Sequence, residues 1–214
     1  MELGNMDNVN VCKELVITIY NNMDASHDYQ HIERVYKNAE TILQSEPQAD
    51  VQIVRLAVLL HDVSDAKYTQ TKEAEERILQ KLDLTDEQRQ HIRDIIASVS
   101  FNGGNELQAK TIEAKIVRDA DRLDAIGAVG IARTFAYGGA KGRKLYDDAE
   151  EARANMSVEQ YRTKSTASVT HFYEKLLLLK DLKKKKKGKQ MAEERHAFMV
   201  SFLEQLQKER DGIV

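Results

Sequence analysis

The stretch VQIVRLAVLLHD, residues 51–62, is the most apolar helical pattern in the chain. Asp50 precedes it as an N-cap, and its apolar residues run almost all the way round rather than along one face. A helix of this kind lies at the centre of a fold, so we expect a central buried helix from Val51 to about Val63. It ends in His61 and Asp62, a polar pair that is costly to bury unless something compensates it.

Helical periodicity continues on both sides of this stretch, and Thr85 with Gln88 reads as a capping box. The chain has one proline, no tryptophan and 6% aromatic residues, while strong helix formers dominate. The sequence therefore predicts an all-α fold, a compact multi-helix arrangement with loops at 102–105 and 138–142. The further expected helices are Val11–Asn22, Tyr29–Gln44, Gln70–Lys81, Asp86–Ser98, one from just after Thr111 to Tyr137, Ser157–Leu182 and Lys189–Arg210.

The length and net charge of the chain limit the number of domains and the classes of function to consider. With 214 residues we expect one domain over 1–214, with a core at about 21–140 and a C-terminal helical extension at about 157–210. The net charge of −3 makes nucleic-acid binding unlikely, and no apolar run is long enough for a membrane helix. The lone Cys12 excludes an internal disulfide, and the N-terminus does not resemble a signal peptide. A cytoplasmic protein is the expectation.

Two further polar residues lie on helix faces that otherwise pack. His31 shares a face with Val35, and Asp121 shares one with Val117. With His61 and Asp62 they supply two imidazoles and two carboxylates from three helices that we expect to be buried. Such a set suits Mn²⁺, Mg²⁺, Fe²⁺, Co²⁺ or Ni²⁺ and leaves positions for water and a substrate oxygen. The alternatives are hydrogen-bonded core residues and, for the His-Asp pair, an exposed helix end.

The segments around these residues resemble known blocks. HDYQHIERV (27–35) is similar to the HDxxHxxRV block of the HD-domain phosphohydrolase superfamily, LLHDVSD (59–65) to LLHDIxD, and DADRLDAIGA (119–128) to a block of one bacterial branch. The resemblance covers about residues 21–206. It implies an all-α HD fold with a central buried metal site. One divalent ion, with Mn²⁺ favoured, would be held by His31, His61, Asp62 and Asp121.

The same resemblance implies cleavage of phosphate esters or anhydrides, and this branch is associated with nucleotides, including hydrolysis of (deoxy)nucleoside triphosphates to monophosphate and pyrophosphate. Asp65 lies four residues after His61. If the helix continues one turn, it could align or deprotonate a water, or protonate a leaving oxygen. Lys67 could hold a phosphate oxygen. Solvent-exposed positions are the alternative for both.

Substrate-binding candidates are basic. His27 could reach the site if its helix starts early, while Asp28 caps that helix. Arg122 contacts substrate or forms a structural ion pair with Asp119. Lys141 and Arg143, in a glycine-rich loop, could neutralise a polyphosphate. The resemblance alone suggests that His171, Tyr173 and Lys175 line the pocket, whereas Gly127 and Gly130 are expected to let another helix approach closely.

Other functions stay open. An HD fold can act as a non-catalytic nucleotide-binding regulatory module, and a di-iron HD oxygenase needs extra histidines, of which only His91 lies between Asp62 and Asp121. The lysine run at 183–187 is either a solvated turn or an anion patch. The partners we expect are a small phosphorylated substrate, a nucleotide first of all, and, if the chain self-associates, a second copy in a homodimer.

Overall fold

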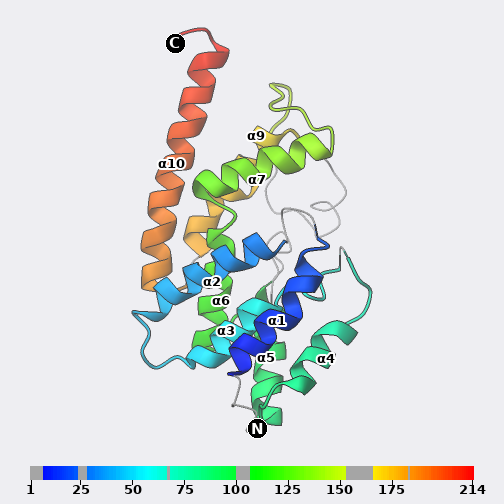
Figure 1. Ribbon diagram of the computed structural model, residues 1–214. Helices are drawn as coiled ribbons and strands as arrows, with labels where there is room; N and C mark the ends of the chain where they lie inside the picture. Colours follow the sequence, from blue (N-terminus) through cyan, green and yellow to red (C-terminus); the bar gives the residue numbers. More distant parts are fainter. Residues whose placement is uncertain (1–6, 24–27, 67, 100–106, 153–165, 183) are drawn as a thin grey trace. The chain divides into compact units, whose positions relative to one another are not determined.

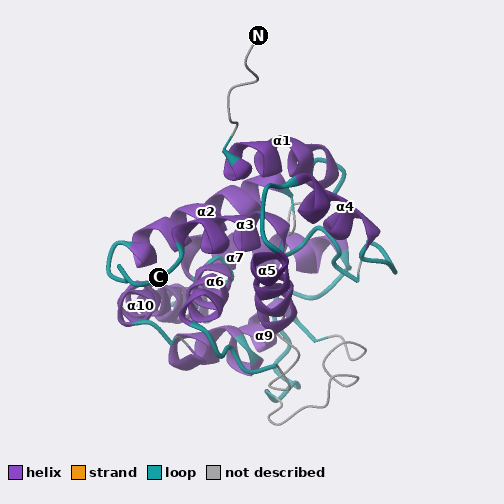
Figure 2. Cartoon of the chain, turned by 90° about the horizontal axis from the view of Figure 1, so that it is seen from below, coloured by secondary structure: helices purple, strands orange, loops and turns teal. Residues whose placement is uncertain are grey.

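The computed structural model describes residues 7–23, 28–66, 68–99, 107–152, 166–182 and 184–214. Every regular element within these ranges is a helix, as Figure 2 shows, which confirms the all-α prediction. The chain divides into two compact units, Met1–Ser100 with Leu107–Asp121 and Phe101–Glu106 with Arg122–Val214. None of the described helices has the length and apolarity needed to cross a bilayer.

The first unit is built around one helix, α3. Its elements are α1 (Asn8–Tyr20), α2 (Tyr29–Leu43), α3 (Val51–Leu60), α4 (Glu73–Lys81), α5 (Asp86–Val99) and most of α6 (Ile112–Leu123) (Figure 1). α3 packs against α1, α2 and α5, and its second half, Leu56 to Leu60, is almost completely buried. The apolar stretch is therefore the central helix that its composition predicts.

Short polar side chains act as N-caps for three helices of this unit. Asp28 accepts a hydrogen bond from the His31 N–H at 3.0 Å, and Asp50 accepts one from the Ile53 N–H at 3.1 Å. Thr85 and Gln88 bond each other's backbone N–H, as in a capping box. These three starts confirm the capping residues that the sequence indicates.

α3 is shorter than predicted, because it ends at Leu60 and not near Val63. His61 Nδ1 donates a hydrogen bond to the Val58 carbonyl oxygen at 2.7 Å. In a continuing helix that carbonyl would accept from the N–H four residues later, that of Asp62. Tight turns follow, with the Val63 N–H donating to Leu60 and the Asp65 N–H to Asp62, both at 3.1 Å. The premise that Asp65 sits on a continuing helix is therefore wrong.

The second unit consists of α7 (Gly127–Ala140), α9 (Ser168–Glu174), the 3₁₀ helix η1 (Leu176–Leu182) and α10 (Lys186–Arg210). α10 packs against α7 and η1, and α9 packs against α7 and η1. Three phenylalanines, one from each α-helix, gather with ring centroids 5.8–6.2 Å apart: Phe135, Phe172 and Phe202. This cluster is the unit's aromatic core.

The helix predicted from Thr111 to Tyr137 is in fact two helices, α6 and α7. The break follows from Gly127, whose φ of +72° is left-handed, and from Gly130, where a Cβ would lie 2.3 Å from the Ala125 carbonyl oxygen. A Cβ added at Gly127 would lie 3.0 Å from the Arg195 side chain of α10. The close approach is thus found at Gly127, whereas Gly130 serves the turn before it.

Other boundaries also move. α7 continues to Ala140, so the glycine loop starts at Lys141 and not at Gly138, which packs against Ser168. The predicted cap at Ser157 lies outside the described residues, and the described part of that predicted helix is α9 followed by η1. The end of the lysine run forms the first turn of α10, while Lys183 lies outside the described residues.

Candidate metal centre

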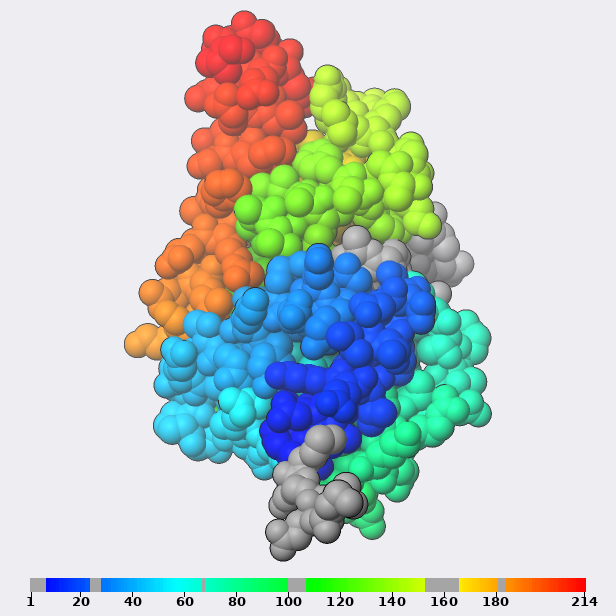
Figure 3. Space-filling view, viewed as in Figure 1, coloured from blue at the N-terminus to red at the C-terminus, as the bar shows by residue number. Residues whose placement is uncertain are grey.

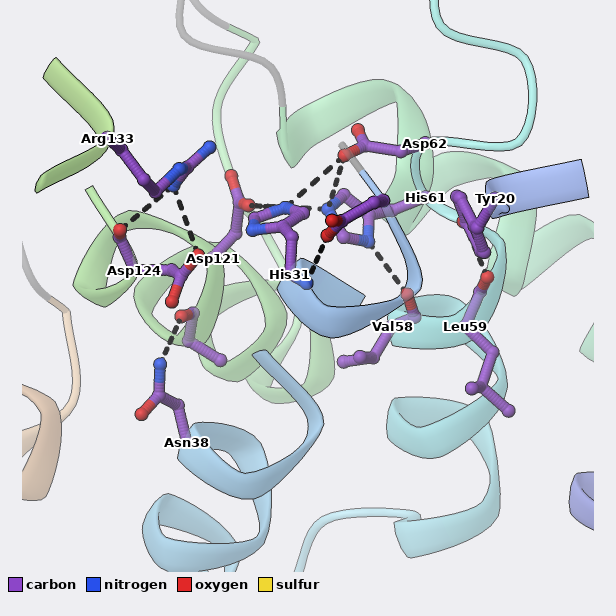
Figure 4. Close-up of polar contacts among 12 residues, drawn as sticks. Tyr20, His31, Asn38, Val58, Leu59, His61, Asp62, Asp121, Asp124 and Arg133 are labelled. Carbon is purple, nitrogen blue, oxygen red and sulfur yellow. Dashed lines mark hydrogen bonds and ion pairs between the residues drawn. The ribbon is translucent and has the colours of Figure 1, made fainter. Parts of the chain in front are cut away.

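Four side chains of the first unit, from α2, the turn at the end of α3 and α6, meet at one point (Figure 4). His31 lies in the first turn of α2, His61 caps α3, Asp62 follows it, and Asp121 lies in α6. Asp62 Oδ2 is 3.4 Å from Nε2 of both histidines, and Asp121 Oδ1 is 3.5 Å from Nε2 of His31 and 3.3 Å from that of His61. The structure thus brings together all four predicted ligands.

These separations fit a single metal ion. Two N or O ligands about 2.1 Å from one ion lie about 3.0–3.5 Å apart at octahedral or tetrahedral angles. The ligand atoms of His31, His61 and Asp121 all lie within 4.8 Å of one another, and Asp62 adds its oxygen beside both imidazoles. The mixed nitrogen and oxygen set favours a divalent ion of the Mn²⁺ to Ni²⁺ series or Mg²⁺.

The orientation of His61 supports the same conclusion. Its Nδ1 lies 2.7 Å from the Val58 carbonyl oxygen, so Nδ1 carries the proton and donates. In the neutral ring Nε2 is then left with its lone pair, which points at both carboxylates. The hydrogen bond that ends α3 therefore also leaves His61 Nε2 in the orientation that a metal ligand requires.

The two sides of the cluster differ in exposure. The His31 and His61 side chains are 3% and 2% exposed, whereas those of Asp62 and Asp121 are 14% and 25% exposed. Within the described residues the two imidazoles are therefore the buried part of the cluster and the two carboxylates are its accessible part.

The histidines and carboxylates of the cluster stabilise one another's charged forms. Burial favours the neutral form of His61, but the carboxylates of Asp62 and Asp121 outweigh it and raise its pKa to about 9. Burial likewise opposes the charge of Asp121, yet hydrogen bonds from His31 and His61 keep its pKa well below the usual range. Without a cation the site is therefore an ion-pair cluster, and a divalent ion bound there would have to displace imidazole protons.

Two buried residues that sequence reasoning missed hold the backbone next to the candidate ligands. The Tyr20 hydroxyl donates to the Leu59 carbonyl at 2.7 Å, and the Asn38 amide donates to the Ala120 carbonyl at 3.1 Å. Each carbonyl lies within two residues of a ligand, and burial raises the Tyr20 pKa well above its usual value. Asn38 lies two turns after His31 on an apolar face, which is the signal that could have found it.

The predicted catalytic residue Asp65 lies in the turn after α3 and is half-buried. Its carbonyl accepts hydrogen bonds from the N–H groups of Tyr68 at 3.0 Å and Thr69 at 3.2 Å, so its backbone is fixed on both sides. Its role stays a prediction. Lys67 and His27, the other candidates near the ligands in sequence, lie outside the described residues.

The remaining basic candidates belong to the second unit. Arg122 is 4% exposed, Lys141 is exposed at the end of α7, and Arg143 is half-buried; their contact with substrate stays a prediction. Arg133, which we expected on the same helix as Arg122, lies on α7. It donates to the Asp124 carbonyl oxygen at 2.8 Å and to the Asp124 carboxylate at 3.1 Å.

Comparison with known proteins agrees with this geometry. The HD domain family model matches residues 28–126, a span that contains all four candidate ligands. The Bacillus subtilis protein YpgQ is 38% identical over 204 residues, which cover 92% of this chain and 91% of YpgQ. The chain belongs to the HD-domain superfamily of metal-dependent phosphohydrolases.

Solved structures show the same relationship. A Lactobacillus plantarum protein has a TM-score of 0.84 at 31% identity, with 96% of this chain and 97% of that one covered. A Bacillus thuringiensis protein described as an HD-superfamily hydrolase has a TM-score of 0.75 at 39% identity, covering 95% and 96%. Bacillus subtilis YpgQ in complex with ADP has a TM-score of 0.73 at 33% identity, covering 94% of each chain.

Proposed function

We propose that this phosphohydrolase acts on nucleotides and converts a nucleoside or deoxynucleoside triphosphate to the monophosphate and pyrophosphate. The observation that carries the hydrolytic part is the cluster of two imidazoles and two carboxylates with His61 Nε2 turned toward the carboxylates. The nucleotide part is supported by YpgQ, a relative similar over nearly its whole length, which has been crystallised with ADP.

His31, His61, Asp62 and Asp121 would hold the divalent ion, with Mn²⁺ as the first candidate. When bound there, such an ion supplies Lewis acidity toward a phosphoryl oxygen and lowers the pKa of a water. The protein's own contribution is to exclude solvent on the imidazole side and to leave the carboxylate side open to a phosphate group.

Asp65 is the residue we assign to proton handling. It follows the ligands by three residues, and its backbone is anchored by three hydrogen bonds, one that it donates and two that its carbonyl accepts. In this role its carboxylate orients the attacking water and takes its proton, or returns a proton to the leaving phosphate oxygen.

The test is turnover by metal-stripped protein refilled with Mn²⁺, with a panel of nucleotides and separate assays for phosphate and pyrophosphate. We expect pyrophosphate from a triphosphate, lost on stripping and restored by Mn²⁺. Phosphate alone would contradict cleavage between the α and β phosphates. No turnover with Mn²⁺ measurably bound would overturn the nucleotide assignment and favour the regulatory alternative.

Metal analysis also tests the di-iron alternative. His91 donates to or accepts from Thr111 Oγ1 at 3.1 Å and lies 3.6 Å from Glu113. Within the described residues the potential metal-binding group of His31, His61 and Asp121 does not include it. We therefore expect one ion per chain, and two irons with a visible absorption band would contradict the proposal.

A further inference from the structure

The surface helix α4 carries one acidic side chain on its buried side. The helix belongs to the teal-green region of Figure 3, and its Arg77 and Lys81 are exposed. Glu75, in contrast, is 1% exposed and shares the buried side of the helix with Ile78 and Leu79. A carboxylate on the apolar side of a helix opposes folding unless something compensates it, so the position of Glu75 needs a physical reason.

The neighbouring acid, Glu76, holds α4 in place. It accepts hydrogen bonds from Nε and Nη2 of Arg93 in α5 at 2.7 and 2.8 Å, which lower its pKa. Arg89 of α5 donates to two carbonyls at the end of α4, each at 3.1 Å. These bonds fix α4 to α5, and Glu75 takes part in none of them.

Glu75 faces the turn that follows the candidate ligand Asp62. Both of its carboxylate oxygens and the Ser64 Oγ of that turn are inaccessible to solvent, and the Ser64 hydroxyl interacts with the carboxylate. Burial raises the Glu75 pKa, and Lys72 and Ser64 offset this only in part. The fold therefore keeps an acid beside Ser64 although burial disfavours its charge.

The backbone of this turn sets the position of Asp65. The Asp65 N–H donates to the Asp62 carbonyl at 3.1 Å, with Ser64 between them in the chain. A change in the backbone angles of Ser64 therefore moves Asp65 relative to Asp62. Reacting groups need to be held within about 0.5 Å of their productive position by residues behind them, so whatever fixes Ser64 also matters for Asp65.

We propose that Glu75, acting through Ser64, is a positioning residue that fixes the turn from Asp62 to Asp65 and holds the Asp65 carboxylate in place for proton transfer. This role rests on the proposed function of Asp65. An acceptor held by α4 restricts the Ser64 side chain, and with it the backbone on either side. The stability that the buried acid costs is then retained because activity needs a fixed turn.

The test uses matched leucine variants at two adjacent positions of α4. Glu75→Leu removes the acceptor beside Ser64 and should lower kcat about tenfold or more, with KM and Mn²⁺ affinity unchanged and the melting temperature no lower. Glu75→Gln keeps a carbonyl acceptor for Ser64 and should restore most of the activity. Glu76→Leu breaks the Arg93 pair, so it should lower the melting temperature and keep kcat. Activity that follows the melting temperature in these variants would overturn the positioning role.

A second readout needs no turnover. Hydrogen exchange of the Asp65 N–H, which bonds the Asp62 carbonyl, reports local opening of the turn. Exchange should be faster in Glu75→Leu and unchanged in Glu76→Leu, and Ser64→Ala should give the same increase if Glu75→Leu does not fold. Unchanged exchange would overturn the inference. Faster exchange in a protein whose unchanged form hydrolyses no nucleotide would instead contradict the proposed function and leave Glu75 as the residue that fixes the turn.

Discussion

α3 and α6 end by different physical means. At the end of α3 a side chain terminates the helix, because His61 Nδ1 donates to the Val58 carbonyl and the helix stops at Leu60. After α6 the backbone conformation redirects the chain, since Ile126 is extended and Gly127 adopts a φ of +72°. The first ending places two candidate ligands, whereas the second only redirects the chain. A helix end made by a functional side chain couples stability to chemistry, and one made by glycine does not.

The largest effect we expect comes from removing a ligand. His31→Ala and His61→Ala should each abolish tight metal binding and lower activity on the order of 10³-fold or more. Because only His61 also ends α3, His61→Ala should in addition lower the melting temperature of the metal-free protein more than His31→Ala does. Metal analysis, turnover and thermal unfolding measure the three quantities.

His91→Ala is the control for this pair, because His91 is also a partly buried histidine of the first unit but bonds Thr111. It should keep both metal and activity. Retained tight metal binding in His31→Ala would contradict the ligand assignment. Equal melting temperatures for the two ligand variants would show that the His61 hydrogen bond does not define the end of α3.

The next effect tests the support behind that helix end. Tyr20→Phe removes the hydroxyl that donates to Leu59, two residues before His61. Outer-shell partners of metal ligands typically contribute about 10–100-fold in metal affinity, so we expect a loss in that range. Calorimetry with Mn²⁺ measures it. Tyr36→Phe makes the same change where the hydroxyl bonds no described residue, and an equal loss there would refute the positioning role.

Substitutions at the turn after α6, which Gly127 forms, should change the free energy of unfolding but not the metal affinity. Gly127→Ala places a Cβ on a left-handed residue and against Arg195, which should cost about 1–2 kcal/mol of unfolding free energy. Gly139→Ala, in the same helix with nothing within 4 Å of the added Cβ, should instead stabilise by up to about 1 kcal/mol. Denaturant unfolding measures both, and metal affinity should stay unchanged in each. A neutral Gly127→Ala would refute the backbone argument.

These two endings also show what a sequence can predict. The apolar residues of α3 predict the central helix, and the polar residues His31 and Asp121 on otherwise apolar faces indicate the candidate ligands, because a buried polar residue needs a compensating partner. Hydrophobic periodicity could not show that α3 stops at Leu60, since the break depends on a rotamer of His61. Nor could it separate α6 from α7, because glycine within a helical pattern is tolerated and only the backbone angle reveals the turn.

The supports Tyr20 and Asn38 were missed for a different reason. Each acts through a hydrogen bond to a backbone carbonyl that is distant in sequence, Leu59 and Ala120 respectively. Carbonyls are present at every residue, so no residue type marks the acceptor. The candidate ligands are recognisable by their chemistry, whereas Tyr20 and Asn38 are recognisable as their supports only once the helices are packed.

The smallest effect concerns the turn after α3. Ser64 Oγ in that turn and both carboxylate oxygens of Glu75 in α4 are buried, and an interaction with Ser64 lowers the Glu75 pKa less than burial raises it. Burial raises the pKa of Glu75, and Lys72 opposes this only in part. The folded protein therefore holds the Glu75 proton more tightly than the unfolded chain, so Glu75 costs stability as the pH rises through its raised pKa.

Glu75→Gln removes that cost and should stabilise the protein at pH 7.5 by about 1 kcal/mol, an advantage that shrinks toward pH 4. Its neighbour Glu76 provides the control of opposite sign, since the bonds to Arg93 at 2.7 and 2.8 Å lower its pKa. Glu76→Gln should lose stability at pH 7.5 and lose less as the pH falls. Melting temperatures across this range measure both. A destabilised Glu75→Gln at pH 7.5 would show that the native structure needs the buried carboxylate in its charged form.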